Sequence, residues 1–207
     1  MLRIWGRITS LNVRKVVFTA QLLGIPFEQV DAGLAYGVVQ TPEYKAKNPN
    51  SLVPLLEDED GFTLWESNVI VRYLCARHGA GGLYPQALRE RFDAERWMDW
   101  QQATLNPAGR NAFIQLVRTP AERRDAAALA QSQAETGPLL DMLDAQLARQ
   151  SFLAAGHLTM ADIPVAADVH RWLGLPLQHA GRPHLARWFE TIRGLPAARG
   201  VFDVPLS

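Results

Sequence analysis

The pattern of the sequence changes at residues 79–87, GAGGLYPQA, and this change divides the chain into two kinds of structure. Three glycines and a proline in nine residues interrupt any helix or central strand. Before this stretch, short apolar runs alternate with helical patterns, which is typical of an α/β unit. After it, the sequence is almost wholly helical in pattern. We therefore predict an α/β domain at residues 1–80, a linker at 81–87 and an all-α domain at 88–207.

The first domain is expected to run strand, helix, strand, helix, strand, strand, helix. Its strands are expected at residues 2–5, 27–31, 55–57 and 62–64. Asn12 suits the N-cap of a helix that ends before Gly24. Thr41 suits the N-cap of a short helix with Pro42 at its first position. The acidic turn at residues 58–61, DEDG, predicts a hairpin between the last two strands.

The second domain is expected to contain four long helices. They are predicted at residues 88 to about 117, 121–148, 159–173 and 183–192. Thr119 and Pro120 are expected to end the first of these helices and to start the second, with Thr119 as its N-cap. Thr159 and Asp162 have the spacing of a capping box, with Asp162 at the third helical position.

Composition excludes several classes of partner. The 207 residues carry 21 basic and 21 acidic side chains, so no charge excess favours nucleic acid or an anionic membrane surface. No apolar run approaches the roughly 20 residues of a transmembrane helix, and the N-terminus has no signal-peptide pattern. We therefore expect a cytoplasmic location. The single cysteine, Cys75, excludes an internal disulfide, and no histidine has metal-ligand spacing, so we expect no metal.

Residues 48–74, NPNSLVPLLEDEDGFTLWESNVIVRYL, contain two features that indicate a ligand site. Val53 precedes Pro54 at the start of a predicted strand, and a cis bond there would leave the Val53 backbone free to pair with a peptide-like ligand. Glu66 and Ser67 open a predicted helix, whose free amides favour a carboxylate. A carboxylate side chain beside them can hold an ammonium group. The pattern therefore predicts a pocket for a small zwitterion with a peptide backbone.

Short motifs in a fixed order extend this prediction to the whole chain. They include WGR, NVRKV, NPN, LVPLL, LWESN, IVRYL, WMDW, LVRTP and ERRD. In this order and spacing the chain resembles the cytosolic glutathione transferases, and most of all their bacterial B type. The resemblance implies a thioredoxin-like N-terminal domain, a helical C-terminal domain and a homodimer that pairs through the start of its long helices. It also implies an enzyme that joins reduced glutathione, as co-substrate, to small electrophiles.

The resemblance assigns roles to residues of this sequence. Glu66 and Ser67 would hold the γ-glutamyl end of glutathione, as partners of its ammonium and carboxylate groups. The backbone of Val53, beside Pro54, would pair with the cysteinyl unit. The backbone of Val39 would approach the glycyl end.

A thiol is a poor nucleophile until it ionises, so the turn after the first strand must supply groups that stabilise a thiolate. Redox proteins of the thioredoxin type carry C-x-x-C there, whereas this chain has Thr9-Ser10-Leu11-Asn12, with no cysteine and no tyrosine. Dithiol redox chemistry at that turn is therefore excluded. Ser10 offers a hydroxyl, Asn12 offers an amide at the start of the helix, and Thr9 is a third candidate. The sequence leaves this choice open.

The second substrate is expected between the two domains. Arg110 matches an arginine of the B type and would bind an anionic electrophile, with a halogenated carboxylate as one candidate; a solvated helix charge is the alternative. Trp97, Trp100 and Phe113 either line an apolar pocket or belong to the core. A glutathione-dependent isomerase or dehalogenase, or a non-catalytic binding protein, remain alternatives for the function. Thr9-Ser10-Leu11-Asn12 lacks the S-S-x-C stretch that the isomerases usually carry near the first helix.

Overall fold

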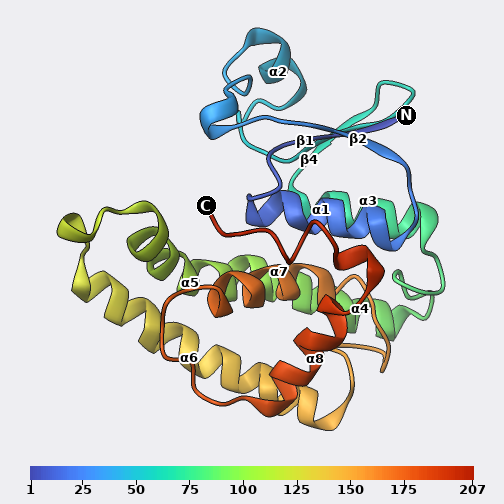
Figure 1. Ribbon diagram of the computed structural model, residues 1–207. Coiled ribbons are helices and arrows are strands. Elements are labelled where there is room, and N and C mark those ends of the chain that lie inside the picture. The colour runs from blue at the N-terminus through green and yellow to red at the C-terminus, as the bar shows by residue number, and fades with distance from the viewer.

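The structure is a computed structural model that describes residues 1–207. Figure 1 shows a small sheet with two helices, α1 and α3, packed against one of its faces, and a layer of helices beyond them. Every element after residue 87 is helical. The structure thus confirms the predicted fold class, a thioredoxin-like domain followed by an all-α domain.

The sheet has four short strands in the order β2-β1-β3-β4. The strands are β1 (Leu2–Trp5), β2 (Phe27–Val30), β3 (Leu55–Glu57) and β4 (Thr63–Trp65). β1 is parallel to β2 and antiparallel to β3, so Ile4 lies opposite both Gln29 and Leu56. A parallel pair needs a crossover, and α1 supplies it.

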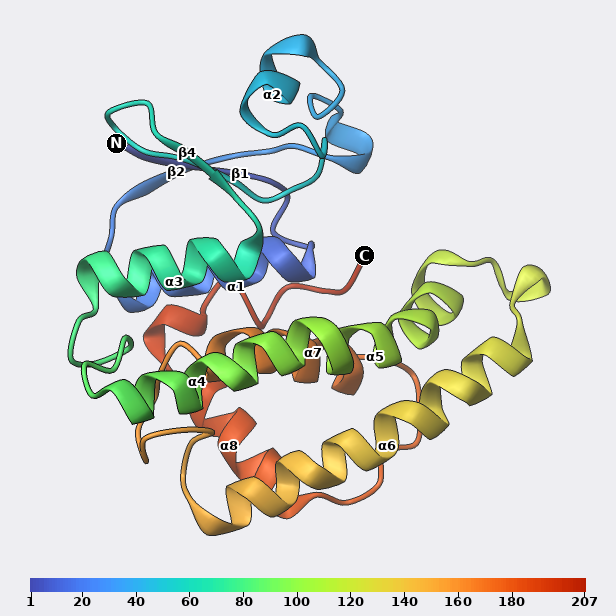
Figure 2. The same ribbon diagram turned by 180° about the vertical axis from the view of Figure 1, so that it is seen from behind.

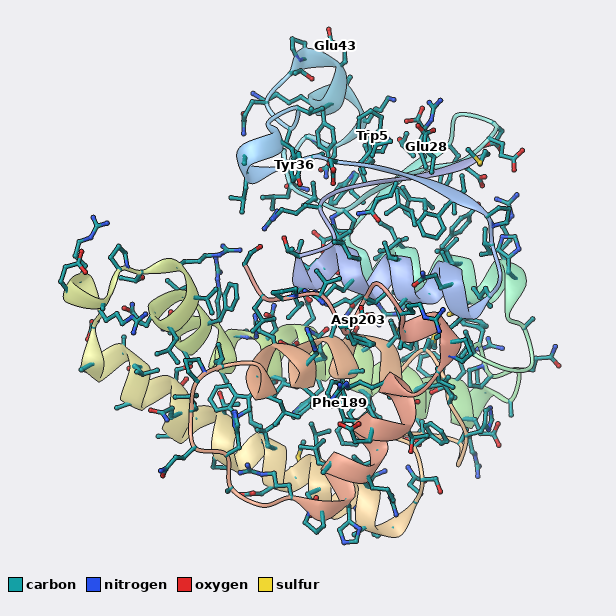
Figure 3. All side chains as sticks on the ribbon, viewed as in Figure 1. Trp5, Glu28, Tyr36, Glu43, Phe189 and Asp203 are labelled. Carbon is teal, nitrogen blue, oxygen red and sulfur yellow. The ribbon has the colours of Figure 1, made fainter.

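Two helices, α1 (Leu11–Leu22) and α3 (Ser67–His78), cover one face of the sheet. The short helix α2 (Pro42–Lys47), capped by Thr41 as predicted, lies on the other side, where Figure 3 labels Tyr36 and Glu43. The predicted N-cap of α1 was wrong, because the backbone is still extended at Ser10 and Asn12 already lies in the first turn. Serine and asparagine are both favoured caps, so the sequence pattern could not separate them.

The long helix predicted at 88–117 runs without a break from Leu88 to Arg118. It contains α4 (Leu88–Trp100), a π-helical turn η2 (Gln101–Leu105), α5 (Asn106–Phe113) and a second π-helical turn η3 (Ile114–Arg118). Pro107 lacks an amide donor and its ring crowds the carbonyl four residues earlier, which lies within η2. The π turn accommodates that conflict without ending the helix.

The next helix, α6 (Ala126–Arg149), begins five residues later than predicted. Thr119 is not its N-cap, because the Thr119 hydroxyl donates to the carbonyl of Ile114 and closes the preceding helix. A 3-10 turn η4 (Ala121–Arg123) follows, and the side chain of Asp125 accepts from the amides of Ala127 and Ala128 at 2.9 and 3.0 Å. A charged aspartate at this position replaces the predicted threonine cap.

The helical domain is completed by α7 (Asp162–Leu173) and α8 (Pro183–Arg193), which Figure 2 shows beside α4, α5 and α6. The capping box was predicted at the correct residues, because the Thr159 amide donates to Asp162 Oδ2 at 2.9 Å and the Ala161 amide donates to Thr159 Oγ1 at 3.3 Å. Its position in the helix was wrong. Asp162 is the first residue of α7, since residues 160–161 form a turn that precedes it and that the Asp162 amide closes on the Thr159 carbonyl at 3.1 Å.

The two domains share one hydrophobic core. Buried residues of α1 and α3 belong to the same cluster as those of α4, α7 and α8. Phe18 of α1 packs edge to face against Phe202, with ring centroids 5.0 Å apart. Cys75 lies in this core, and burial raises the pKa of its thiol to about 12. None of the helices is both long enough and apolar enough to cross a membrane.

Candidate functional site

A cavity of about 550 Å³ lies between the two domains, where the N-terminus of α1 faces α5 and η3. Residues of the first domain that line it are Arg7, Thr9, Ser10, Leu11, Asn12, Arg14, Gly33, Leu34, Val39, Ser51, Leu52 and Val53. Residues of the second part of the chain that line it are Gln102, Asn106, Arg110, Phe113, Ile114, Arg118, Ala167, His170, Arg171 and Leu206. The cavity therefore brings together Ser10, Asn12, Val39, Val53 and Arg110, five of the residues predicted from the sequence.

The N-terminus of α1 presents free donors to this cavity. The amides of Leu11, Asn12 and Val13 have no acceptor, and the Ser10 side chain makes no capping hydrogen bond. The Asn12 side-chain oxygen is also without a partner. Free amides and the helix dipole give this end a partial positive charge, which stabilises an anion such as a thiolate. Thr9 lines the same cavity, so all three candidates from the sequence are in reach of it.

The backbone of Val53 faces the cavity with its hydrogen-bonding groups free. Its peptide bond to Pro54 is cis, and neither the amide nor the carbonyl of Val53 has a hydrogen-bond partner. Pro54 itself is buried immediately before β3 and does not line the cavity. Val39 lines the cavity, although its amide is already bonded to the carbonyl of Gly37 at 2.8 Å. Val53 is therefore able to pair with an extended peptide.

Glu66 and Ser67 lie next to the cavity but do not line it. Glu66 is the exposed N-cap of α3 with φ 71°, an uncommon conformation for a residue with a side chain. Ser67 is the buried first residue of α3. The two places are connected through Lys15, whose ammonium lies 3.4 Å from Ser67 Oγ and 3.5 Å from Gln102 Oε1, and Gln102 lines the cavity.

The cavity is strongly positive. Its lining contains five arginines and no aspartate or glutamate, although the whole chain has no net charge. Burial lowers the pKa of Arg7, and the nearby charge of Arg118 lowers it further. Burial likewise lowers the pKa of Arg118, with contributions from Arg110 and Arg171. Arginines that repel one another in a partly buried space favour an anionic ligand.

The sequence analysis found only one of these arginines, Arg110. Arg118 follows it by eight residues on the same helical path, so helical spacing was a signal that would have placed both on one face. Arg7 lies in the turn after β1, within the WGR motif that contributed to the family resemblance, but the sequence analysis assigned it no role in the site. Phe113 lies beside them, with the guanidinium of Arg118 4.8 Å from its ring centroid.

Trp97 and Trp100 do not line the cavity. Trp97 is buried, and its ring meets that of Trp100 edge to face at 5.3 Å. They pack in the core, which was the second of the two interpretations given for them. No group of three or more histidine, cysteine, aspartate or glutamate side chains is arranged to hold a metal ion.

A thioredoxin-like domain, a helical domain and a cavity between them at the cysteine-free N-terminus of α1 together define a glutathione-transferase type of enzyme. Comparison with known families agrees. Residues 9–77 match the N-terminal domain of glutathione S-transferases, and residues 106–196 match the C-terminal domain. The chain therefore belongs to the glutathione S-transferase family, and it is a transferase of that family.

Individual relatives match over nearly their full lengths. Glutathione S-transferase GstB of Escherichia coli K12 is 41% identical over 208 residues, which cover 100% of both chains. Glutathione S-transferase 3 of Zea mays is 30% identical, over 99% of this chain and 95% of its own. The crystal structure of the theta class glutathione S-transferase from Xanthomonas axonopodis pv. citri with glutathione bound is 40% identical, with a TM-score of 0.95 over 100% of this chain and 99% of that one.

Proposed function

We propose that the protein conjugates reduced glutathione, through its sulfur, to small anionic electrophiles, of which halogenated carboxylates are one class. The observation that carries this proposal is the composition of the interdomain cavity. One side has the free amides of the α1 N-terminus, and the other has Arg110 and Arg118, neither of which forms an ion pair with an aspartate or glutamate side chain. Such a cavity suits two anions, a thiolate and the charged group of its reaction partner.

Glutathione would lie along the edge of the first domain. Glu66 and Ser67 would bind the ammonium and carboxylate of its γ-glutamyl end, the Val53 backbone would pair with the cysteinyl unit, and Val39 would meet the glycyl end. The free backbone of Val53 and the free first-turn amides of α3 support this placement. The related Xanthomonas structure, whose chain is 40% identical, contains bound glutathione.

The sulfur of glutathione would then lie at the N-terminus of α1. A free thiol has a pKa near 8.5, so lowering it by one or two units requires about 1.4 kcal/mol for each unit. A hydroxyl donor at Ser10 or an amide at Asn12, together with the helix dipole, is sufficient for that.

The reaction itself would be a substitution at the electrophilic carbon. The thiol proton is released to solvent, and the thiolate forms a carbon–sulfur bond as the carbon–halogen bond breaks and halide leaves. Arg110 and Arg118 would hold the carboxylate of the electrophile so that its carbon faces the sulfur. They would take no part in the proton transfer.

We further propose a homodimer in the cytoplasm. Five large apolar side chains are exposed on neighbouring elements, namely Phe62, Trp65, Val69, Leu88 and Phe92. They come from the β4 hairpin, from α3 and from the start of α4, and exposed apolar patches of this kind are typical of protein interfaces. Sedimentation of the purified protein at micromolar concentration, with Phe92→Glu as the variant, tests this assembly.

The function is tested by calorimetric titration with reduced glutathione, followed by turnover with bromoacetate. The intact protein should bind glutathione with a micromolar to millimolar Kd, and Ser67→Ala should weaken binding at least about tenfold, or 1.4 kcal/mol. Halide release should depend on both glutathione and protein. Binding without turnover of bromoacetate or of aryl halides would indicate a non-catalytic binding protein, and absence of binding would overturn the proposal altogether.

A further inference from the structure

Lys15 is a fully buried lysine with no carboxylate in ion-pair contact. It projects from α1 and has no exposed surface. Its ammonium contacts only neutral oxygens, at Ser67 (3.4 Å), Asn68 (3.1 Å), Gln101 (3.0 Å) and Gln102 (3.5 Å). Burial of an unpaired charge is expensive, so a lysine kept in this position needs a reason.

The four oxygens around this ammonium come in equal numbers from α3 and from the π turn η2. Gln101 and Gln102 are successive residues of η2, and their side-chain oxygens lie 3.0 and 3.5 Å from the Lys15 ammonium. Gln101 also accepts from the Asn68 side chain at 3.1 Å and donates to Asp168. The Asp168 carboxylate therefore makes no direct contact with the Lys15 ammonium, and the hydrogen bonds that connect them run through the side chain of Gln101.

The nearest acids do not neutralise Lys15 by contact. Asp168 forms its own ion pair with Arg171, at 2.5 Å, and Arg171 is a second positive charge near the lysine. Glu66 lies at the exposed end of α3, and its carboxylate makes no ion pair with Lys15. The buried junction between α1, α3 and η2 therefore carries a positive charge that no acid contacts.

Ser67 connects the buried ammonium of Lys15 to the N-terminus of α3, where the ligand carboxylate is expected to bind. Its hydroxyl oxygen accepts from Lys15, so its own proton is free to donate in another direction. The amides of Ser67, Asn68 and Val69 are also free, because the first helical bond of α3 comes from Ile70. A carboxylate placed at this terminus would meet a hydroxyl donor and free amides, with an ammonium group directly behind the hydroxyl.

We propose that Lys15 is a positioning residue for the α-carboxylate of the γ-glutamyl group, acting through the hydroxyl of Ser67. The inference rests on the proposed function, because it assumes that glutathione binds at α3. Lys15 orients the hydroxyl proton of Ser67 towards the ligand, and its positive charge attracts the ligand carboxylate. It does not touch the ligand.

This role has a consequence for pH. Burial lowers the pKa of Lys15 to about 8, with Arg171 lowering it further and Asp168 and Glu66 acting in the opposite direction. The groups that face the ammonium from α3 and η2 are uncharged amides and a hydroxyl. A ligand carboxylate bound at Ser67 must raise this pKa, because it favours the charged lysine. Glutathione binding should therefore depend on the charge of a residue that it does not contact.

The first test compares two ligands on the Lys15→Met variant. S-methylglutathione removes the thiol ionisation, and its analogue with γ-aminobutyrate in place of the γ-glutamyl unit lacks only the α-carboxylate. Lys15→Met should weaken binding of S-methylglutathione by about tenfold and change binding of the analogue by less than about twofold. Lys45→Met, at an exposed lysine of α2 with no ion pair, is the control and should change neither. Equal losses for both ligands would overturn the proposal.

The second test uses the unaltered protein, in case Lys15→Met does not fold. The pKa of Lys15 is followed by NMR of its ¹³Cε nucleus, in the free protein and with each saturating ligand. S-methylglutathione should raise the pKa by at least about half a unit, and the analogue should not. An unchanged pKa on binding of S-methylglutathione would show that the lysine has only a structural role. Failure of the intact protein to bind S-methylglutathione would instead refute the proposed function.

Discussion

The Arg14 guanidinium lies 2.8 Å from the carbonyl oxygens of both Val204 and Pro205, and it also donates to the carbonyl of Val201. Arg14 belongs to α1, so the first domain holds the last residues of the chain in place. Figure 1 shows this terminal segment running between α1 and α7, and Figure 3 labels Asp203 at its start. Leu206, at the end of the segment, lines the interdomain cavity.

Replacement of Arg14 should release this segment. Arg14→Met keeps most of the buried stem but leaves three carbonyls without a charged donor, and we expect a loss of about 2–3 kcal/mol in the free energy of unfolding. Urea denaturation measures the loss, and limited proteolysis should cut the variant within the last residues. Arg199→Met, at an exposed arginine whose guanidinium has no partner, is the control. A proteolytic pattern identical to that of the intact protein would contradict this role for Arg14.

Asp162 is the second stabilising centre, and it joins three segments of the helical domain. Its carboxylate accepts from the amides of Leu153 and Thr159 and from the indole nitrogen of Trp188, at 3.0, 2.9 and 2.9 Å. Asp162→Asn turns one acceptor into a donor, which then faces a donor. We expect the free energy of unfolding to fall by about 2–4 kcal/mol.

The matched control for this substitution is Asp31→Asn, at an exposed aspartate without an ion pair, which should change stability by less than about 0.5 kcal/mol. Urea denaturation at pH 7 compares the three proteins. If Asp162→Asn is as stable as the control, the carboxylate does not hold the loop and α8 to α7.

His170 should make stability fall with acidity. In the folded protein the pKa of His170 is lowered from 6.5 to about 4, mainly by burial and further by the nearby positive charges of Arg14 and Arg193. Between these two values the unfolded chain binds more protons than the folded one, so stability decreases as pH falls. Going from pH 7 to pH 5 should cost about 2 kcal/mol through this residue alone.

The variant His170→Phe isolates that contribution. It retains the packing with Phe189 and Phe202 but does not titrate. Burial raises the pKa of Asp162 to about 6, so this residue has the opposite effect, and its contribution to stability is lost as pH rises. Because Asp162 is present in both proteins, its effect cancels in the comparison. The loss in free energy of unfolding from pH 7 to pH 5 should therefore be about 2 kcal/mol larger in the intact protein than in His170→Phe. Parallel pH profiles would refute the assignment.

Ser10 should be the main hydroxyl donor to the glutathione sulfur. Ser10→Ala is expected to raise the apparent pKa in the pH profile of kcat/KM by about one unit. It should change stability by less than about 1 kcal/mol, because the side chain makes no capping bond. Thr9→Ala and Asn12→Ala are the matched comparisons. A larger shift in either of them would move the role to that residue.

Arg110 and Arg118 should determine the preference for anionic electrophiles. Arg110→Leu and Arg118→Leu are each expected to lower kcat/KM for bromoacetate at least about tenfold, through the loss of an ion pair with its carboxylate. Turnover of the neutral 1-chloro-2,4-dinitrobenzene should change by less than about twofold. Arg123→Leu, on the 3-10 turn outside the cavity, is the control. A parallel loss for both substrates would show that these arginines do not select charge.

Sequence reasoning was most accurate where the structure is local. The strand ends came within one residue, and Thr41 was correctly assigned as the cap of α2, because a cap depends on residues three apart. Thr159 and Asp162 were correctly paired, although the helix begins only at Asp162. It was least accurate where two good caps compete. Ser10 replaced Asn12, and Asp125 replaced Thr119, because the choice between neighbours depends on where the helix is held by the rest of the molecule.

The sequence by itself determined the order of the elements, the break near residue 80 and the motif at Val53-Pro54 and Glu66-Ser67. These follow from periodicity, from turn residues and from short motifs, which are properties of adjacent residues. The tertiary structure decided which distant charges meet. Arg7 joins Arg110 and Arg118 in one cavity, and Lys15 lies behind Ser67, only because α1 packs between the sheet and α7. The free-energy cost of each charged side chain depends on how deeply it is buried, and the pattern of residue types along the chain does not show burial residue by residue.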